Sequence, residues 1–294
     1  MSNRRTVIKN MLAGSAALAA GNILSSYSPQ LNNKKFKLKG NINHSVCRWI
    51  LSELSLDELC EVVKSIGFNA IDLLGPKDWL TAQKHGVYCS MCYTAGEFTN
   101  NLYNGFAHAD DHAQLIKDYS DVIPLIAKAG YKDVICFSGT RKGMDDETGF
   151  KNCIVGLKQV LPLAEKNGIT MHMELLNSKI DHKDYMCNKS AWGIELCKRI
   201  NSPNFKLLYD IYHMQIDEGD IIRTITDNHQ YFGHYHTGGV PGRHEIDDTQ
   251  ELHYPAIMRA IVASGFKGYV AQEFMPTWKD KVASLREAIG ICDV

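Results

Sequence analysis

The chain repeats one pattern, in which a short apolar run is followed by a stretch with helical spacing. The apolar runs, interpreted as strands, lie at 41–46, 69–73, 87–93, 132–137, 169–175, 205–210, 231–236 and 268–274. Strands that alternate with helices over brief connections predict a parallel sheet. Eight parallel strands are the number that closes into a (β/α)8, or TIM, barrel. We therefore predict an α/β protein with a single TIM-barrel domain at residues 41–294.

Local helix signals agree with this pattern. Ser55 and Glu58 have the spacing of a capping box, which begins a helix, and Gly67 is placed to end that helix. Pro162 lies inside the helix predicted at 147–166, so that helix is expected to kink or split. An open doubly wound sheet is the alternative fold, but no glycine-rich dinucleotide-binding motif follows the first strand.

The first thirty residues differ from the rest of the chain. A polar start that contains Arg4 and Arg5 precedes an apolar run at 11–20 that is rich in small residues. This arrangement predicts a signal peptide over 1–30, and the paired arginines indicate the twin-arginine route. Residues 31–40 are polar and basic and are interpreted as a linker. We expect an exported, periplasmic protein with no membrane span in the mature chain, because the apolar run is too short for one.

Composition narrows the classes of partner. The formal net charge is −1, and no block of lysine or arginine lies in the predicted barrel, so we expect no nucleic-acid partner. The nine cysteines are odd in number and irregularly spaced, which argues against a disulfide framework. Cys89 and Cys92 have CxxC spacing without a second pair, and we interpret them as core residues. The oligomeric state stays open, with a homo-oligomer as one option.

Each of the last four predicted strands ends in an ionisable side chain. These residues are Glu174, Asp210, His236 and Glu273. The carboxyl ends of barrel strands converge on one face, and a charge buried there is costly unless it is paired or bound to a metal. Salt bridges among strand ends are the simpler interpretation. Three carboxylates and one imidazole on consecutive strands favour a site for one divalent ion, such as Mn²⁺, Mg²⁺, Co²⁺ or Zn²⁺.

Other polar residues lie close to these strand ends in the sequence. His213 follows Asp210 by three residues and is placed to contact a substrate oxygen. Arg243 lies in the glycine-rich loop after the seventh strand, where it could bind a carboxylate or hydroxyl unless it pairs with Glu245. We expect His234 to be structural and to face away from the site. The long loop at 94–108 is a candidate lid.

Two carboxylates beside one metal ion suggest a reaction. A metal that holds a carbonyl and an adjacent hydroxyl acidifies the C–H bond between them. Glu174 and Glu273 lie on non-adjacent strands, so one could remove a proton and the other return it. This chemistry is isomerisation or epimerisation through an enediolate, with the two glutamates as catalytic residues, and it requires no organic cofactor.

The stretch Gly233-His234-Tyr235-His236, with Val240-Pro241-Gly242-Arg243-His244-Glu245, resembles hydroxypyruvate isomerases. The four strand-end residues resemble the wider xylose isomerase-like superfamily of TIM barrels, which includes sugar isomerases and ketose 3-epimerases. The resemblance covers about residues 40 to 290. It implies that Glu174, Asp210, His236 and Glu273 bind the metal, that the two glutamates exchange protons, and that His213 and Arg243 contact a sugar or keto-acid substrate. Hydroxypyruvate isomerases usually carry Gln at the position of His236 and often an acidic residue at that of Gly239, whereas ketose epimerases share the histidine.

Three other functions fit parts of the sequence. A metal-dependent dehydratase of a keto-sugar or keto-inositol could use the same residues. An exported, non-catalytic sugar-binding barrel would need no acid/base pair. An endonuclease-type phosphodiesterase of this superfamily would need further histidine ligands on the third and fourth strands, which end in Cys89-Ser90-Met91-Cys92-Tyr93 and Cys136-Phe137-Ser138-Gly139.

Overall fold

The computed structural model describes residues 37–97 and 99–294, which belong to one compact unit that runs to Val294. The predicted signal peptide and most of the predicted linker lie outside the described residues. Residues 37–40 form neither helix nor strand. Among the described residues, no helix has the length and apolar character needed to cross a bilayer.

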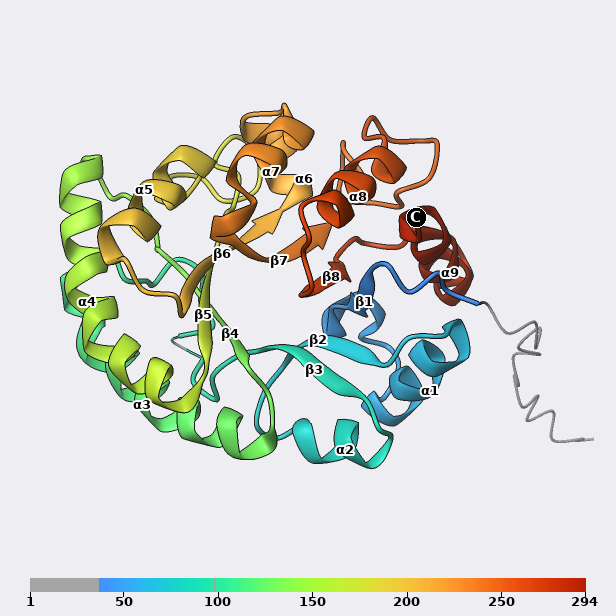
Figure 1. The fold of residues 1–294 in the computed structure, drawn as a ribbon, viewed down its shortest axis with the longest axis horizontal. Coiled ribbons are helices and arrows are strands. Elements are labelled where there is room, and N and C mark those ends of the chain that lie inside the picture. Colours follow the sequence, from blue (N-terminus) through green and yellow to red (C-terminus); the bar gives the residue numbers. More distant parts are fainter. Residues whose placement is uncertain (1–36, 98) are drawn as a thin grey trace, which may run out of the picture. The chain divides into compact units, whose positions relative to one another are not determined.

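One parallel sheet forms the centre of this unit (Figure 1). Its strands are β1 Asn43–Val46, β2 Ala70–Leu74, β3 Tyr88–Cys92, β4 Asp133–Cys136, β5 Thr170–Glu174, β6 Phe205–Asp210, β7 Phe232–Thr237 and β8 Tyr269–Gln272. They pair in the order β1-β8-β7-β6-β5-β4-β3-β2. A parallel bridge between Cys47 and Asp72 joins the end of β1 to β2, the two outer strands of that order. The prediction of an eight-stranded barrel is therefore confirmed.

Helices form an outer ring around the strands (Figure 1). They are α1 Leu56–Ile66, α2 Trp79–Lys84, α3 His112–Ala129, α4 Asp146–Asn167, α5 Ser190–Ile200, α6 Ile211–Asp217, α7 Ile221–Asn228, α8 Tyr254–Ala263 and α9 Lys281–Cys292. Short 3₁₀ helices lie at Arg48–Leu51, Ala109–Asp111 and His229–Tyr231. Strand and helix alternate along the chain, as the repeated pattern predicts.

Helix ends follow the local sequence signals closely. Ser55 and Glu58 form the predicted capping box of α1, and Gly67 ends that helix in the left-handed conformation, with φ 112°. Pro162 was expected to kink or split this helix, and the split is wrong, because α4 runs unbroken through the proline. The buried face of α4 around Val160 and Ala164 packs into the core on both sides of the proline. This packing outweighs the one backbone hydrogen bond that proline removes.

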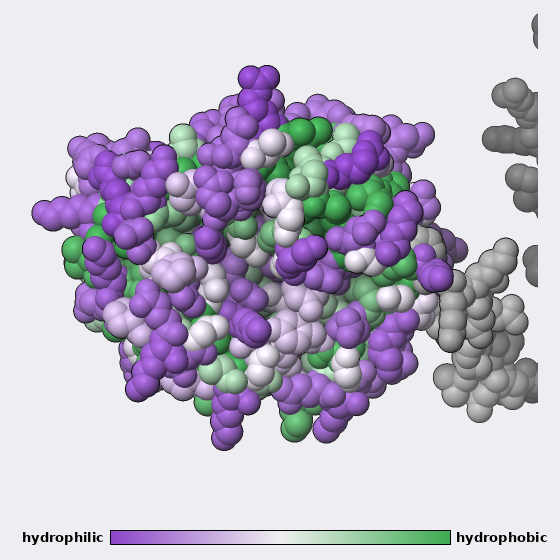
Figure 2. Space-filling model, viewed as in Figure 1, coloured by the Kyte–Doolittle hydropathy of each residue, from purple (hydrophilic) through white to green (hydrophobic). Residues whose placement is uncertain are grey.

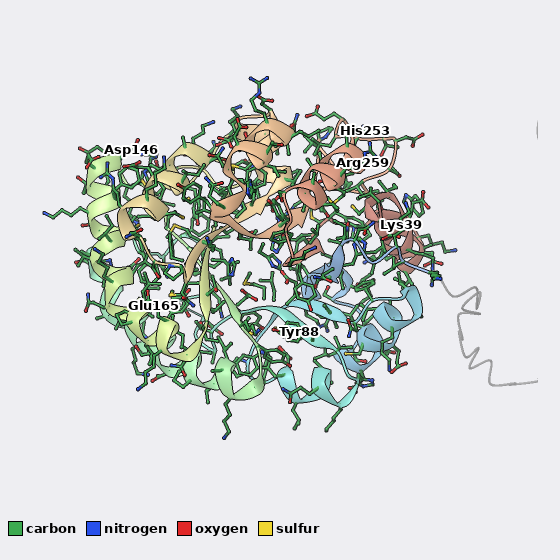
Figure 3. The ribbon with its side chains drawn as sticks, viewed as in Figure 1. Lys39, Tyr88, Asp146, Glu165, His253 and Arg259 are labelled. Carbon is green, nitrogen blue, oxygen red and sulfur yellow. The ribbon has the colours of Figure 1, made fainter. Side chains whose placement is uncertain are left out.

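Polar and apolar residues separate between the rim and the centre of the unit. Figure 2 shows hydrophilic side chains around the rim and a more mixed population toward the centre. The charged residues labelled in Figure 3, such as Asp146 and Glu165, lie at the periphery, whereas Tyr88 lies near the centre. Tyr88 stacks on Tyr269 with ring centroids 5.6 Å apart, and it meets Tyr131 edge to face. The amino-terminal ends of β3 and β8 are thus joined by aromatic packing.

Candidate active site

The four predicted strand-end residues meet at one point. Glu174 and Asp210 are the last residues of β5 and β6, His236 lies in β7, and Glu273 directly follows β8. All four are buried, and each offers one ligand atom within 4.8 Å of the other three. The geometry that the barrel imposes thus brings together the residues that the sequence pattern selected.

The charges of this cluster fit a divalent cation. Three carboxylates are buried side by side, and the guanidinium of Arg243 reaches two of them. Burial raises the pKa of Glu174, and it raises the pKa of Asp210 well above its usual range despite the lowering effect of Arg243. A buried anion without a full counter-charge is unfavourable. A cation with oxygen and nitrogen ligands would supply the missing positive charge.

The two glutamates have different surroundings. The carboxylate of Glu273 accepts hydrogen bonds from Trp49 Nε1 at 2.9 Å and from Arg243 Nη2, and it lies 2.8 Å from His236 Nδ1. Burial alone would raise the pKa of Glu273, but Arg243 and His236 lower it well below the usual range. Glu174 Oε1 lies 3.2 Å from His236 Nδ1. The pair therefore combines one carboxylate held in its ionised form with one that is closer to protonation.

Arg243 is held by the loop that follows β7. Its guanidinium lies between the rings of Trp49 and Tyr212, at 5.3 and 5.4 Å from their centroids. It contacts the site and not the neighbouring Glu245, whose carboxylate accepts hydrogen bonds from Thr277 and Trp278.

The same loop explains a departure of this chain from hydroxypyruvate isomerases. Gly239 pairs with His244 in an antiparallel bridge. A Cβ added at Gly239 would lie 2.1 Å from the backbone oxygen of Glu245. This loop conformation therefore excludes the acidic side chain that those enzymes often carry there.

His213 is oriented by a residue that the sequence analysis missed. Its Nδ1 lies 2.7 Å from the side-chain amide of Asn177, which donates to it, so Nε2 carries the proton. That Nε2 is buried, lies 3.6 Å from Asp210 Oδ2 and makes no hydrogen bond with a described residue. Burial lowers the pKa of His213 well below its usual range. His213 is thus a neutral donor at the site. His182, which the sequence pattern also does not indicate, packs beside it with ring centroids 5.1 Å apart.

A pocket of about 400 Å³ opens above the cluster. Its charged and polar lining includes Glu174, Glu273, His213, His182 and Arg243. The remaining wall is largely apolar and comprises Leu73, Tyr93, Leu102, Ile135, Phe137 and Leu176. Asn100 and Leu102 belong to the 94–108 loop, so this candidate lid lines the pocket directly. The volume falls in the range of small-molecule sites.

A second buried group lies on the far side of His236. Asp72 Oδ2 lies 2.8 Å from His236 Nε2, and Asp72 Oδ1 lies 3.1 Å from His234 Nε2. The expectation that His234 faces away from the site is wrong, because residues two apart on a strand share a face. Burial alone would raise the pKa of Asp72, but these two histidines lower it. The sequence pattern does not single out Asp72, because this residue lies inside an apolar run and not at its end.

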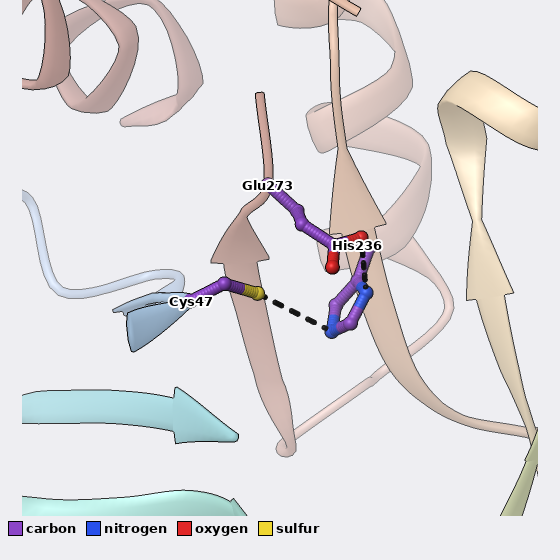
Figure 4. Close-up of side chains that lie close together, drawn as sticks. All are labelled: Cys47, His236 and Glu273. Atoms are coloured by element: carbon purple, nitrogen blue, oxygen red, sulfur yellow. Dashed lines mark hydrogen bonds and ion pairs between the residues drawn. The ribbon is translucent and has the colours of Figure 1, made fainter. Parts of the chain in front are cut away.

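Figure 4 shows His236 with two of its neighbours, Cys47 and Glu273. Its ring lies between Glu273 and Cys47, and the Cys47 sulfur is 3.8 Å from Nε2. Cys89 and Cys92 are buried, as predicted, with their sulfur atoms 3.5 Å apart. None of the candidate metal groups among residues 37–97 and 99–294 includes a residue of β3 or β4. Those strands supply no further histidine ligands.

Residues 60–290 match the family model described as xylose isomerase-like TIM barrel. The chain belongs to this family. Among its relatives, the 2-oxo-tetronate isomerase of Cupriavidus necator is 34% identical over 113 residues, which are 38% of this chain and 43% of that protein. The 2-oxo-tetronate isomerase of Pectobacterium atrosepticum is 24% identical over 72% of this chain and 84% of that protein. The hydroxypyruvate isomerase of Escherichia coli is 28% identical over 50% of this chain and 57% of that protein. The match to the Cupriavidus necator protein thus spans less than half of its length.

Solved structures share this fold. The crystal structure of an AP endonuclease, family 2, from Brucella melitensis has a TM-score of 0.75 and 24% identity, covering 83% of this chain and 96% of that one. An L-ribulose 3-epimerase has a TM-score of 0.70 and 18% identity, covering 85% of this chain and 92% of that one. At this identity the likeness concerns the barrel, and the function depends on the site residues.

Proposed function

We propose that this xylose isomerase-like barrel is a metal-dependent isomerase or epimerase of a small sugar or keto acid. The observation that carries the proposal is the meeting of Glu174 and Glu273 at His236 Nδ1, at 3.2 and 2.8 Å. Two carboxylates from non-adjacent strands thereby flank one position at the base of the pocket. The related 2-oxo-tetronate and hydroxypyruvate isomerases support the same reaction class.

Glu174, Asp210, His236 and Glu273 would hold the ion, which would polarise a substrate carbonyl and acidify the adjacent C–H bond. One glutamate removes the proton from that carbon and the other delivers a proton to the resulting enediolate.

The residues around the pair bind and orient the substrate. The buried Nε2–H of His213 is a donor for a substrate oxygen. Arg243 offers further N–H donors for a hydroxyl or carboxylate, and its rotation is restricted by Trp49 and Tyr212. The apolar wall excludes water from the reacting carbon, which strengthens the electrostatic interactions within the site.

Metal content of the purified protein is the first test. We expect about one divalent ion per chain after incubation with Mn²⁺ or Co²⁺, measured by elemental analysis. Glu174→Ala should lose the ion, whereas the matched control Glu251→Ala, at an exposed residue outside the cluster, should retain it. Absence of a bound ion in the wild-type protein under these conditions would overturn the proposal.

Product analysis separates this reaction from the alternatives on the same site. The metal-loaded protein is incubated with hydroxypyruvate, 2-oxo-tetronate or ketoses in D₂O. Isomerisation or epimerisation yields a product with the same chemical formula as the substrate, with solvent deuterium at the reacting carbon. A dehydratase instead yields a product that lacks one water. Saturable binding without turnover would identify a sugar-binding barrel instead.

We also propose that residues 1–30 direct export through the twin-arginine route. The adjacent Arg4 and Arg5 before a short apolar run support this assignment. Fractionation of cells that express the full chain tests it. Arg4→Lys with Arg5→Lys should shift the protein from the periplasmic to the cytoplasmic fraction, and an unchanged distribution would contradict the proposal.

A further inference from the structure

The two nitrogens of the His236 imidazole contact different carboxylates. Nδ1 faces the carboxylates of Glu174 and Glu273, and Nε2 faces Asp72. A neutral imidazole carries one proton, so only one of its nitrogens has a lone pair for a cation. The group that accepts that proton therefore decides which nitrogen can bind an ion.

The carboxylate of Asp72 is surrounded by side chains that can donate hydrogen bonds. It is fully buried, and its Oδ1 accepts from the hydroxyl of Ser90 at 2.5 Å. His234 Nε2 lies 3.1 Å from the same oxygen, and Cys47 Sγ lies 3.8 Å from Oδ2. His236 Nε2, at 2.8 Å from Oδ2, has the shortest contact with that oxygen. When an ion takes the Nδ1 side, a carboxylate surrounded by donors would accept the Nε2 proton of His236 and leave the Nδ1 lone pair for the ion.

We propose that Asp72 is a positioning residue that fixes His236 with Nδ1 directed toward Glu174 and Glu273. This inference rests on the proposed metal-dependent function. Histidine ligands gain orientation and basicity when their second nitrogen donates to a carboxylate. Asp72 would thus raise the affinity of the site for its ion without touching the ion or the substrate.

The backbone around Asp72 supports this role independently. The pairing of β2 with β3 shifts register on both sides of Asp72, and Leu73 has φ 59°. A leucine in this left-handed region is strained, and such strain persists only where the surroundings require it. The irregularity lets consecutive residues face inward, since Asp72 meets His236 while Leu73 lines the pocket. A regular strand would direct one of them to the opposite face.

The test compares metal affinity in Asp72→Asn and a matched control. Asn keeps the shape of Asp72 but presents an amide that can donate as well as accept, which weakens the preference for the Nε2–H form. We expect the Kd for Mn²⁺, measured by competition with a chelator, to rise about 10- to 100-fold. Ser90→Ala removes a donor from the other oxygen of the same carboxylate and should change Kd by less than about 3-fold.

Further readouts separate positioning from a general loss of structure. Thermal unfolding in the presence of EDTA shows whether the metal-free variant is folded. If the variant is unfolded, NMR of the wild-type protein decides the question. The protein is labelled with ¹⁵N-histidine and loaded with Zn²⁺, and the ring nitrogen shifts show which nitrogen carries the proton. The His236 signals are assigned through their loss in His236→Gln. A proton on Nε2 is expected, and a proton on Nδ1 would overturn the proposal.

The outcomes also distinguish this inference from the proposed function. A wild-type protein that binds no ion refutes the metal-dependent function itself. A wild-type protein that binds its ion, with unchanged affinity in Asp72→Asn, refutes only the role of Asp72. A fall from two ions to one in the variant would show that Asp72 is itself a ligand, together with His234 and His236, and would also overturn the positioning role.

Discussion

The two sides of the pocket have opposite chemistry. The carboxyl ends of β5 to β8 provide three buried carboxylates and an imidazole, together with the Arg243 loop. The ends of β2 to β4 provide Leu73, Tyr93, Ile135 and Phe137. The same barrel thus places reactive groups on one side and an apolar surface on the other.

This difference affects the strength of the electrostatic interactions in the pocket. An apolar wall keeps the local dielectric low, so interactions between charged groups on the opposite side are stronger than in water. Burial has a free-energy cost for carboxylates as well, and it raises the pKa of Glu174 and of Asp210. The polar side should therefore govern turnover and orient the substrate, whereas the apolar side should contribute to substrate binding alone.

Removal of one catalytic carboxylate on the polar side should have the largest effect. Glu273→Gln keeps the size of the side chain but cannot exchange a proton, so kcat should fall about 10²- to 10⁴-fold. Substrate binding, measured by calorimetry with the metal-loaded protein, should persist. Glu251→Gln, at an exposed residue, is the control and should leave kcat unchanged. Turnover within about 3-fold of wild type in Glu273→Gln would remove Glu273 from the acid/base pair.

The polar side was also the more predictable one from sequence. Glu174, Asp210, His236 and Glu273 end or follow apolar strands, and strand ends of a parallel barrel necessarily converge. The fold was predictable for a related reason, because the strand–helix alternation and signals such as Ser55 and Gly67 are local.

Residues that reach the site through irregular structure were not predictable in this way. Trp49 comes from a 3₁₀ helix, Asn177 from a loop, and Asp72 from a strand with shifted register. Helix α6 was also not predicted. Asp210, which was interpreted only as a metal ligand, caps this helix as well, because its side chain accepts a hydrogen bond from the backbone N–H of His213. Such roles depend on contacts between segments far apart in the sequence.

The hydrogen bond from Trp49 to Glu273 should have the next largest effect. Trp49→Phe removes the indole N–H but keeps an aromatic ring beside Arg243, so the change is confined to the polar side. A hydrogen bond to a charged group contributes about 1.5–3 kcal/mol, which corresponds to a 10-fold or larger fall in kcat. Trp278→Phe, at a partly exposed residue, is the matched control. Equal kinetics in both variants would show that Glu273 needs no orientation by Trp49.

A change on the apolar side should affect binding more than turnover. Leu102→Ala removes part of the pocket wall contributed by the 94–108 loop. Loss of about 1 kcal/mol of apolar burial predicts a KM about 5-fold higher with kcat nearly unchanged. Leu80→Ala, on the exposed surface of α2, should alter neither constant. A fall in kcat at constant KM would contradict the division between the two sides and assign the loop to the chemical step.

The smallest effect concerns a buried histidine outside the pocket. Burial lowers the pKa of His44, whose Nε2 lies 3.5 Å from Asp293. The unfolded chain then binds a proton more readily than the folded one below about pH 6.5, so stability should decrease as pH falls through this range. The Tm is measured at pH 8 and at pH 5.5, in EDTA to exclude the metal site. We expect the decrease in Tm between these two pH values to be a few °C smaller for His44→Gln than for the wild-type protein. Identical falls would show that other buried histidines, such as His213 at the polar side, cause the acid sensitivity.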